Sequence, residues 1–281
     1  MIVIKKIADL QKTLGEYRKM GQKLDFVPTM GALHSGHMSL INNSKQSGDA
    51  VIASIFVNPT QFNNPKDFEK YPVTIEKDID LLESAGCDIL FMPNEKEIYP
   101  DDRNKLPRYE LGYIETVLEG KYRPGHFQGV CQVVYRLLQI VEPDHLYLGQ
   151  KDYQQCMVIK KMVEITGLST SITVCATLRE TDGLAMSSRN MRLNTAERAK
   201  AVRISETLQY IQQEVRPGFI ADLTYRAEQY LKAEGFIVDY IAIADAQNLA
   251  ILNNWDGETK IVALIAAYLN EVRLIDNMLL N

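Results

Sequence analysis

The sequence of 281 residues lacks long apolar stretches, a P-loop and any excess of positive charge. Its longest apolar runs, such as 261–269, fall short of the roughly 20 residues that a membrane-spanning helix needs. The 31 lysines and arginines are outnumbered by 36 aspartates and glutamates, and the net charge is −5. This balance argues against a general binder of nucleic acid or anionic membranes, although it does not exclude a local cationic pocket. We expect neither nucleic acid nor membrane as a partner.

Cysteine is also scarce, and its spacing does not suggest a metal site. Cys87, Cys131, Cys156 and Cys175 form no CxxC pair. We expect reduced, buried thiols rather than disulfides or structural zinc. The first residues, MIVIKKIADL, place two lysines after only four residues and lack the long apolar segment of a secretion signal. These features predict a cytoplasmic protein.

The first 180 residues alternate short β-rich runs with helical stretches. Each run is followed by a polar or glycine-containing loop, and the predicted strands are 24–28, 50–57, 89–92, 146–148 and 172–176. This order favours an α/β fold with a Rossmann-like parallel sheet and helices on both faces. Such sheets bind ligands beyond the carboxyl ends of their strands, so we expect the chemistry in the loops that follow them.

The remainder of the chain has a different pattern. A helix is predicted over 195–214, a break at Arg216-Pro217-Gly218 and a second helix over 221–234. Predicted strands follow at 236–243, 260–268 and 272–275, which suggests a small antiparallel sheet. We therefore predict two domains, residues 1–180 and a smaller C-terminal α+β domain over 181–281.

The segment PTMGALHSGH (28–37) runs from a strand through a glycine-containing turn into a helix. His34 and His37 are three residues apart, which places both imidazoles on one helix face near its positive end. Gly31 and Gly36 allow a ligand to approach the backbone closely. The pattern is typical of a phosphate site without lysine, but the two histidines could instead cap the helix or lie in the core. A metal site is disfavoured because no third ligand follows at a suitable spacing.

Two further clusters could hold phosphates, since the chain has neither GxxxxGK[ST] nor GxGxxG after a strand. Gly149-Gln150-Lys151-Asp152 follows a predicted strand and offers a mobile ammonium group. Met186-Ser187-Ser188-Arg189 combines two hydroxyls with a guanidinium, which suits the charge of a departing pyrophosphate. Each cluster taken alone is more typical of a solvated loop.

HxGH combined with the KMSKS-like MSSR is similar to the nucleotidylyltransferase and class I aminoacyl-tRNA synthetase superfamily. Within it, the chain resembles the pantoate–β-alanine ligase family. The matching segments occur in the family's order over most of the first 190 residues: PTMGALHSGH (28–37), SIFVNPTQF (54–62), Tyr71-Pro72, RPGHFQGV (123–130), GQKDYQQ (149–155) and RETDGLAMSSRN (179–190). The final arginine of MSSR departs from the superfamily's lysine but agrees with the narrower family.

This resemblance implies an ATP-dependent condensation of (R)-pantoate with β-alanine through a pantoyl-adenylate, releasing AMP and pyrophosphate. Such an enzyme has to align two anions and neutralise charge as pyrophosphate leaves. The resemblance also implies a homodimer, Mg²⁺ bound with ATP, and a C-terminal domain that acts as a lid. The carboxylate that holds Mg²⁺ is left open among Asp67, Asp78 and Asp152.

The resemblance also assigns roles to individual residues. The implied catalytic groups are His37, as the main proton donor or phosphate partner, His34, Lys151, and the lid residues Ser187, Ser188 and Arg189. The implied ATP-binding residues are Met30, Gly31, Ala32, Leu33, His34, Ser35, Gly36, His37, Gly149, Gln150, Lys151, Asp152, Leu178, Met186, Ser187, Ser188 and Arg189.

For the other substrates, the resemblance implies that Gln61 and Gln155 bind pantoate, since an amide both donates and accepts hydrogen bonds without adding charge. Gln61 would also meet β-alanine. The neighbouring groups are Asn58 and Tyr71, with Phe62 and Val130 as apolar walls. Arg123 either orients an anion or forms a surface ion pair, and His126 acts through another residue.

Two other functions are alternatives to this one. A transferase on the same fold would leave AMP on its product, and a nucleotide-binding regulator would not turn over. An aminoacyl-tRNA synthetase is disfavoured because the acidic chain has no evident tRNA-binding extension.

Overall fold

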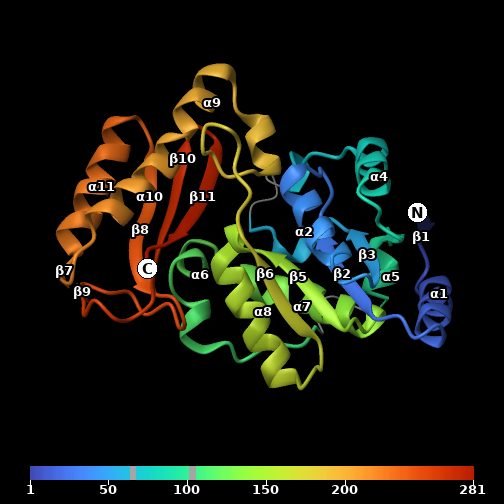
Figure 1. Ribbon diagram of the computed structural model, residues 1–281. Coiled ribbons are helices and arrows are strands. Elements are labelled where there is room, and N and C mark those ends of the chain that lie inside the picture. Colours follow the sequence, from blue (N-terminus) through green and yellow to red (C-terminus); the bar gives the residue numbers. More distant parts are fainter. Residues whose placement is uncertain (64–67, 101–105) are drawn as a thin grey trace. The chain divides into compact units, whose positions relative to one another are not determined.

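A computed structural model describes residues 1–63, 68–100 and 106–281 (Figure 1). The chain divides into two compact units. Unit 1 comprises Met1–Gly149 and Gln155–Ala176, and unit 2 comprises Gln150–Gln154 and Thr177–Asn281. No helix in these ranges is both long and apolar enough to cross a membrane. All four cysteines are buried and free.

Unit 1 is built on a six-stranded sheet in the order β1-β4-β3-β2-β5-β6, and every neighbouring pair is parallel. The strands are β1 (Ile2–Ile4), β2 (Leu24–Thr29), β3 (Ala50–Ile55), β4 (Ile89–Phe91), β5 (His145–Gly149) and β6 (Ser171–Cys175). The predicted parallel sheet is thus confirmed. The short edge strand β1 was not predicted from the sequence.

Helices cover both faces of this sheet, and alternate strand residues show it. Phe26 packs in a core with residues of α1, α7 and α8, whereas the next residue, Val27, packs with residues of α2 and α4. Two covered faces explain why β2 and β3 are apolar almost throughout. The helices of unit 1 are α1 (Ile7–Lys19), α2 (Ser35–Lys45), α4 (Ile75–Ser84), α5 (Glu95–Ile98), α6 (Glu119–Tyr122), α7 (His126–Val141) and, from Gln155 on, α8 (Tyr153–Thr166), with 3₁₀ turns η1 (Pro59–Gln61) and η3 (Gly112–Glu115).

Unit 2 contains an antiparallel sheet in the order β11-β10-β8, which confirms the predicted three strands. Its strands and helices are β8 (Ile237–Asp245), β10 (Ile261–Leu269), β11 (Val272–Leu279), α9 (Thr195–Ala201), α10 (Arg203–Glu214) and α11 (Ala221–Ala233). The helix predicted over 195–214 is interrupted at Val202, between α9 and α10. The unit also holds the 3₁₀ turns η4 (Gln150–Asp152) and η5 (Ser188–Arg192) and a two-stranded ribbon of β7 (Gly218–Phe219) and β9 (Asn254–Trp255).

The strand order of unit 1 reverses beside β2. After β2 the chain adds β3 and β4 on one side, and it then returns to add β5 and β6 on the other. Parallel sheets bind ligands at such a switch point, beyond the carboxyl ends of the strands. The segment that follows β2 is the one that carries HxGH.

Candidate active site

The loop between β2 and α2 is held by a buried carboxylate. Gly31 and Ala32 both have positive φ, +79° and 49°, so the loop turns sharply. Asp78, only 1% exposed, accepts hydrogen bonds from the backbone N–H of Ala32 at 2.9 Å and of Leu33 at 2.8 Å. The hydroxyl of Thr74 donates to the same carboxylate at 2.9 Å. Both oxygens of Asp78 are therefore engaged in shaping the loop.

The two histidines of HxGH form a reciprocal cap at the start of α2. The Nδ1 of His34 accepts a hydrogen bond from the N–H of Gly36 at 3.1 Å, and the Nδ1 of His37 accepts one from the N–H of His34 at 3.3 Å. Their ring centroids are 4.1 Å apart. Because both Nδ1 atoms accept, each neutral ring carries its proton on Nε2. Capping therefore uses one nitrogen of each ring and is compatible with donation to an anion through the other.

The N-terminal end of α2 makes the surroundings of the two imidazoles more positive. The N-terminus of α2 carries the positive end of the helix dipole, and unsatisfied backbone N–H groups gather there. It lies where the central strand β2 ends, at the switch point of the sheet. Two imidazoles at a helix N-terminus are suited to bind phosphate oxygens.

The loop after β3 meets the HxGH loop through Gln61. The side-chain Nε2 of Gln61 donates to the Sδ of Met30 at 2.8 Å. The Nδ2 of Asn58 lies 3.3 Å from the Oε1 of Gln61, and the hydroxyl of Tyr99 donates to the Oδ1 of Asn58 at 3.0 Å. The structure thus brings the residue expected to bind pantoate next to a residue expected to bind ATP.

The RPGHFQGV segment supports the backbone of Gln61. The Nδ1 of His126 lies 2.8 Å from the carbonyl oxygen of Gln61, and the guanidinium of Arg123 lies 3.5 Å from the same atom. Arg123 also forms an ion pair of 3.5 Å with Glu119, whose side chain is 9% exposed. His126 is itself buried. Of the alternatives left open for Arg123, the structure shows an ion pair, largely shielded from solvent.

Gly129 allows α7 to lie directly against the same loop. A Cβ at this position would stand 2.7 Å from the carbonyl carbon of Thr60 and 2.9 Å from the Cα of Gln61. The Nδ2 of Asn58 donates to the carbonyl oxygen of Gly129 at 3.1 Å. Only a residue without a side chain fits between helix and loop.

The remaining residues expected around pantoate lie in different settings. Gln155 is partly buried in the first turn of α8, after β5, which is the strand beside β2. No hydrogen bond joins it to Gln61 in the described part of the chain. The rings of Phe62 and Tyr71 pack edge to face at 5.8 Å. Val130 is buried in the core of unit 1.

In unit 2, the turn that carries Lys151 is anchored by Asn277 of β11. The side chain of Asn277 donates to the carbonyl oxygens of Gln150 at 3.0 Å and Lys151 at 2.8 Å. The amide of Gln150 donates in return to the Oδ1 of Asn277 at 3.3 Å. The ammonium of Lys151 lies 3.5 Å from the carboxylate of Asp152. The backbone of the turn is thus fixed by a residue that sequence reasoning missed.

The segment 178–190 is a hairpin that places Leu178 beside Met186. The N–H of Met186 donates to the carbonyl oxygen of Leu178 at 3.1 Å. The Oγ of Ser187 accepts from the N–H of Arg189 at 3.3 Å and caps η5, while Ser188 is 8% exposed. Leu178 and the MSSR element, expected to contact different parts of ATP, are therefore neighbours.

Ion pairs hold the base of this hairpin. Arg179 binds the buried Asp276 through two hydrogen bonds of 2.6 and 3.0 Å. Burial raises the pKa of Asp276, an effect that Arg179 opposes. Arg198 donates to Glu180 at 2.8 Å and to Asp182 at 2.7 Å, and the latter hydrogen bond lowers the pKa of Asp182. The hairpin is thereby tied to β11 and α9.

Comparison with known proteins gives matches along the whole chain. The family model described as pantoate-beta-alanine ligase matches residues 2–279. The chain belongs to the pantoate–β-alanine ligase family. It is accordingly an enzyme that forms an amide bond. Pantothenate synthetase of Cytophaga hutchinsonii is 44% identical over 283 residues, covering 100% of this chain and 99% of the relative. The enzyme of Porphyromonas gingivalis (strain W83) is 43% identical, covering 99% of each.

Solved structures agree with this assignment. Pantothenate synthetase from Thermus thermophilus is 37% identical with a TM-score of 0.91, and 99% of each chain is covered. Pantoate-beta-alanine ligase from Francisella tularensis is 43% identical with a TM-score of 0.83, covering 99% of this chain and 97% of that one. The latter structure is described as complexed with beta-gamma ATP and beta-alanine. The Rossmann-like fold inferred from the sequence is confirmed.

Proposed function

We propose that the chain condenses (R)-pantoate with β-alanine at the expense of ATP, through a pantoyl-adenylate. The proposal rests on one observation: the imidazoles of His34 and His37, which cap α2, lie together at the switch point of the sheet. The chain also matches the family over residues 2–279. Carboxylates are poor acyl donors, and adenylation supplies a leaving group that an amine can displace. The first requirement of the reaction is therefore a site that binds the phosphates of ATP, rather than a general base.

In the first step, a carboxylate oxygen of pantoate attacks the α-phosphorus of ATP, and the bond to the bridging oxygen of pyrophosphate breaks. The Nε2–H groups of His34 and His37 donate to phosphate oxygens as negative charge shifts onto the departing group. His37 carries the larger share. The loop from Met30 to Leu33, shaped by Asp78, places backbone at the nucleotide. Ser35 and Gly36 complete the segment that binds ATP.

In the second step, the neutral amine of β-alanine attacks the acyl carbon of pantoyl-adenylate, the bond from that carbon to the phosphate oxygen breaks, and AMP and a proton are released. Gln61 and Gln155 bind pantoate, and Gln61 also meets β-alanine. The amide of Gln61 is oriented by Met30 and Asn58, so its donor and acceptor sides are defined before substrate binds. Orienting two small reactants in this way accounts for much of the rate gain of such enzymes.

In this proposal, unit 2 supplies cationic and hydroxyl groups that bind ATP. Lys151 binds the ATP phosphates with Gly149, Gln150 and Asp152, and Leu178 and Met186 bind the nucleotide. Ser187, Ser188 and Arg189 close over the triphosphate when residues 181–281 act as a lid on the domain of residues 1–180. The anchoring of Lys151 by Asn277 supports this role, because it defines the reach of the ammonium group.

Mg²⁺ bound with ATP would neutralise part of the phosphate charge. Asp78 fits poorly as a ligand because its two oxygens accept hydrogen bonds from the HxGH loop. Asp67 lies outside the described residues. Asp152, whose side chain is 45% exposed, fits an ion that retains most of its waters. We further propose a homodimer, as the family resemblance implies, and a cytoplasmic location, where ATP is abundant.

Product analysis tests the function. The purified protein is incubated with ATP, Mg²⁺, pantoate and β-alanine, and each substrate is omitted in turn. The proposal expects pantothenate, AMP and pyrophosphate in equal amounts, and no AMP release without pantoate. A transferase would keep AMP on its product and ignore β-alanine, whereas a regulator would release nothing. Either result would refute the proposal.

A further inference from the structure

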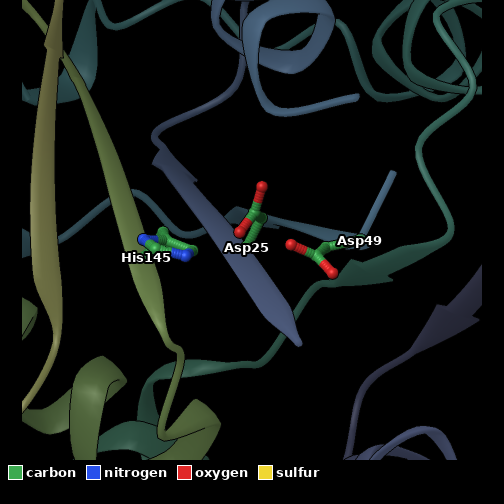
Figure 2. Close-up of side chains that lie close together, drawn as sticks. All are labelled: Asp25, Asp49 and His145. Carbon is green, nitrogen blue, oxygen red and sulfur yellow. The ribbon is translucent and has the colours of Figure 1, made fainter. Parts of the chain in front are cut away.

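A second polar cluster lies in unit 1, away from the HxGH loop. Asp25, Asp49 and His145 each offer a ligand atom, and these three atoms lie within 4.8 Å of one another. Figure 2 shows the carboxylate of Asp25 between the imidazole of His145 and the carboxylate of Asp49. Asp25 is fully buried, while the other two are partly exposed.

The register of the sheet produces this juxtaposition. Asp25 of β2 is the direct partner of His145 in β5 and of Val51 in β3. Partner residues of parallel strands present their side chains on the same face, and residues two apart along an extended chain share a face. Asp49, two residues before Val51, therefore joins Asp25 and His145. The amino-terminal ends of β2, β3 and β5 thus contribute one side chain each.

Only one of the two carboxylate oxygens of Asp25 accepts hydrogen bonds. Its Oδ2 accepts hydrogen bonds from the hydroxyls of Ser44 at 2.9 Å and Ser47 at 3.0 Å. Its Oδ1 is buried and has no hydrogen-bond partner. No ion pair to a lysine or arginine involves Asp25 within the described ranges. A buried carboxylate oxygen without a partner is costly, and a bound cation is one way in which proteins offset that cost.

The surroundings of the cluster are negative. Ser44 lies in the last turn of α2, and the C-terminal end of a helix carries the negative end of its dipole. Tyr147, two residues after His145, is buried on the same face and brings no positive charge. This setting favours a positive ion, whereas an anion would be repelled.

We propose that Asp25, Asp49 and His145 bind a divalent first-row transition-metal ion, with Zn²⁺ as the best match. Two carboxylates and an imidazole are ligands that zinc accepts, whereas the imidazole disfavours Mg²⁺ and Ca²⁺. In a tetrahedral site, ligand atoms about 2.0 Å from the metal are about 3.3 Å apart, so the partly exposed Asp49 and His145 have to close in slightly. Water completes the coordination from the open side.

This site is distinct from the candidate active site. It lies at the amino ends of β2, β3 and β5, while HxGH follows the carboxyl end of β2. Asp25 and Met30 are separated by roughly 16 Å of extended chain at 3.3 Å per residue. An ion there links three strands of unit 1, and it acts on the stability of the fold rather than on the chemistry.

Calorimetric titration with ZnCl₂ of protein stripped by a chelator tests the site. We expect one zinc ion per chain at this position, and at least about a tenfold loss of affinity in Asp49→Asn and in His145→Gln. Asp25→Asn should lose binding too, but the partly exposed positions are the safer test because their variants are expected to fold. Thermal unfolding should shift upward with zinc in the wild type and not in these two variants.

Two controls make the result specific. Asp80→Asn removes an exposed carboxylate of α4 by the same chemical change and should bind zinc as the wild type does. His37→Ala should also retain the site, which separates it from zinc held by HxGH. Anomalous diffraction from zinc-soaked crystals should show a peak between the three side chains. Absence of that peak, or unchanged affinity in Asp49→Asn and His145→Gln, would overturn the proposal without bearing on ligase activity.

Discussion

The carboxylate of Asp78 accepts a hydrogen bond of 2.8 Å from the backbone N–H of Leu33, a residue 45 positions earlier in the chain. The Oδ2 of the same group receives the N–H of Ala32. One buried side chain at the start of α4 thus fixes the loop that leads into His34. The paired imidazoles depend on this loop for their position.

Replacing Asp78 by asparagine should therefore disturb the loop. An amide can accept on only one side, and its NH₂ group would face a backbone N–H, so one buried donor loses its partner. We expect a loss of about 1–3 kcal/mol in the free energy of unfolding and a slower ATP–pyrophosphate exchange. Denaturant titration and exchange assays measure the two effects. Asp80→Asn, an exposed change in the same helix, is the matched control, and equal behaviour of the two variants would contradict the role of Asp78.

The loop-holding role of Asp78 shows what sequence patterns leave out. The β-rich runs predicted the strands because both faces of the sheet are covered, and the HxGH spacing predicted two imidazoles on one face. Asp78 itself reads only as an acidic residue in the first turn of a helix, a common position for a carboxylate. Its partners include backbone N–H groups, which nearly every residue type has, so the sequence cannot indicate them.

Asn277 was missed for a related reason. It pairs with the Lys151 turn from a strand 126 positions away, and an asparagine in a β-strand carries no signal of its own. Likewise, the spacing of His34 and His37 could not reveal which ring nitrogen accepts a hydrogen bond, because that depends on the loop conformation. The short strand β1 is defined by its pairing with β4 rather than by a pattern.

His34→Asn separates capping from chemistry. Asparagine is among the best N-cap residues, so the start of α2 should remain formed and the stability should change by less than about 1 kcal/mol. The Nε2–H donor is lost, however, and we expect adenylate formation to fall by at least about tenfold. Circular dichroism and pyrophosphate exchange report the two properties. Full activity in this variant would show that His34 serves only as a cap.

His37→Ala should have the larger effect on catalysis. We expect pyrophosphate exchange to fall by about two to three powers of ten, as when other preorganised transition-state donors are removed. The fold should persist, because α2 is held by its packing. An exchange rate equal to that of the wild type would remove His37 from the mechanism.

Gln155→Ala tests the assignment of pantoate to the start of α8. The loss of an amide that we expect to contact only the acid should raise the KM for pantoate more than that for ATP. Steady-state kinetics with each substrate varied at saturating levels of the others separate the two constants. If both KM values rise by the same factor, Gln155 does not contact pantoate specifically.

Gly129→Ala tests whether the packing of α7 positions Gln61. The added methyl would stand 2.9 Å from the Cα of Gln61, closer than packed atoms tolerate, so the loop has to move. Because Gln61 is expected to bind pantoate and β-alanine, the KM for both should rise while that for ATP changes less. Gly15→Ala in α1 is the matched control, since its Cβ meets nothing within 4 Å and should add roughly 0.5–1 kcal/mol of stability. Unchanged kinetics in Gly129→Ala would mean that the loop accommodates the methyl and that its position does not set substrate affinity.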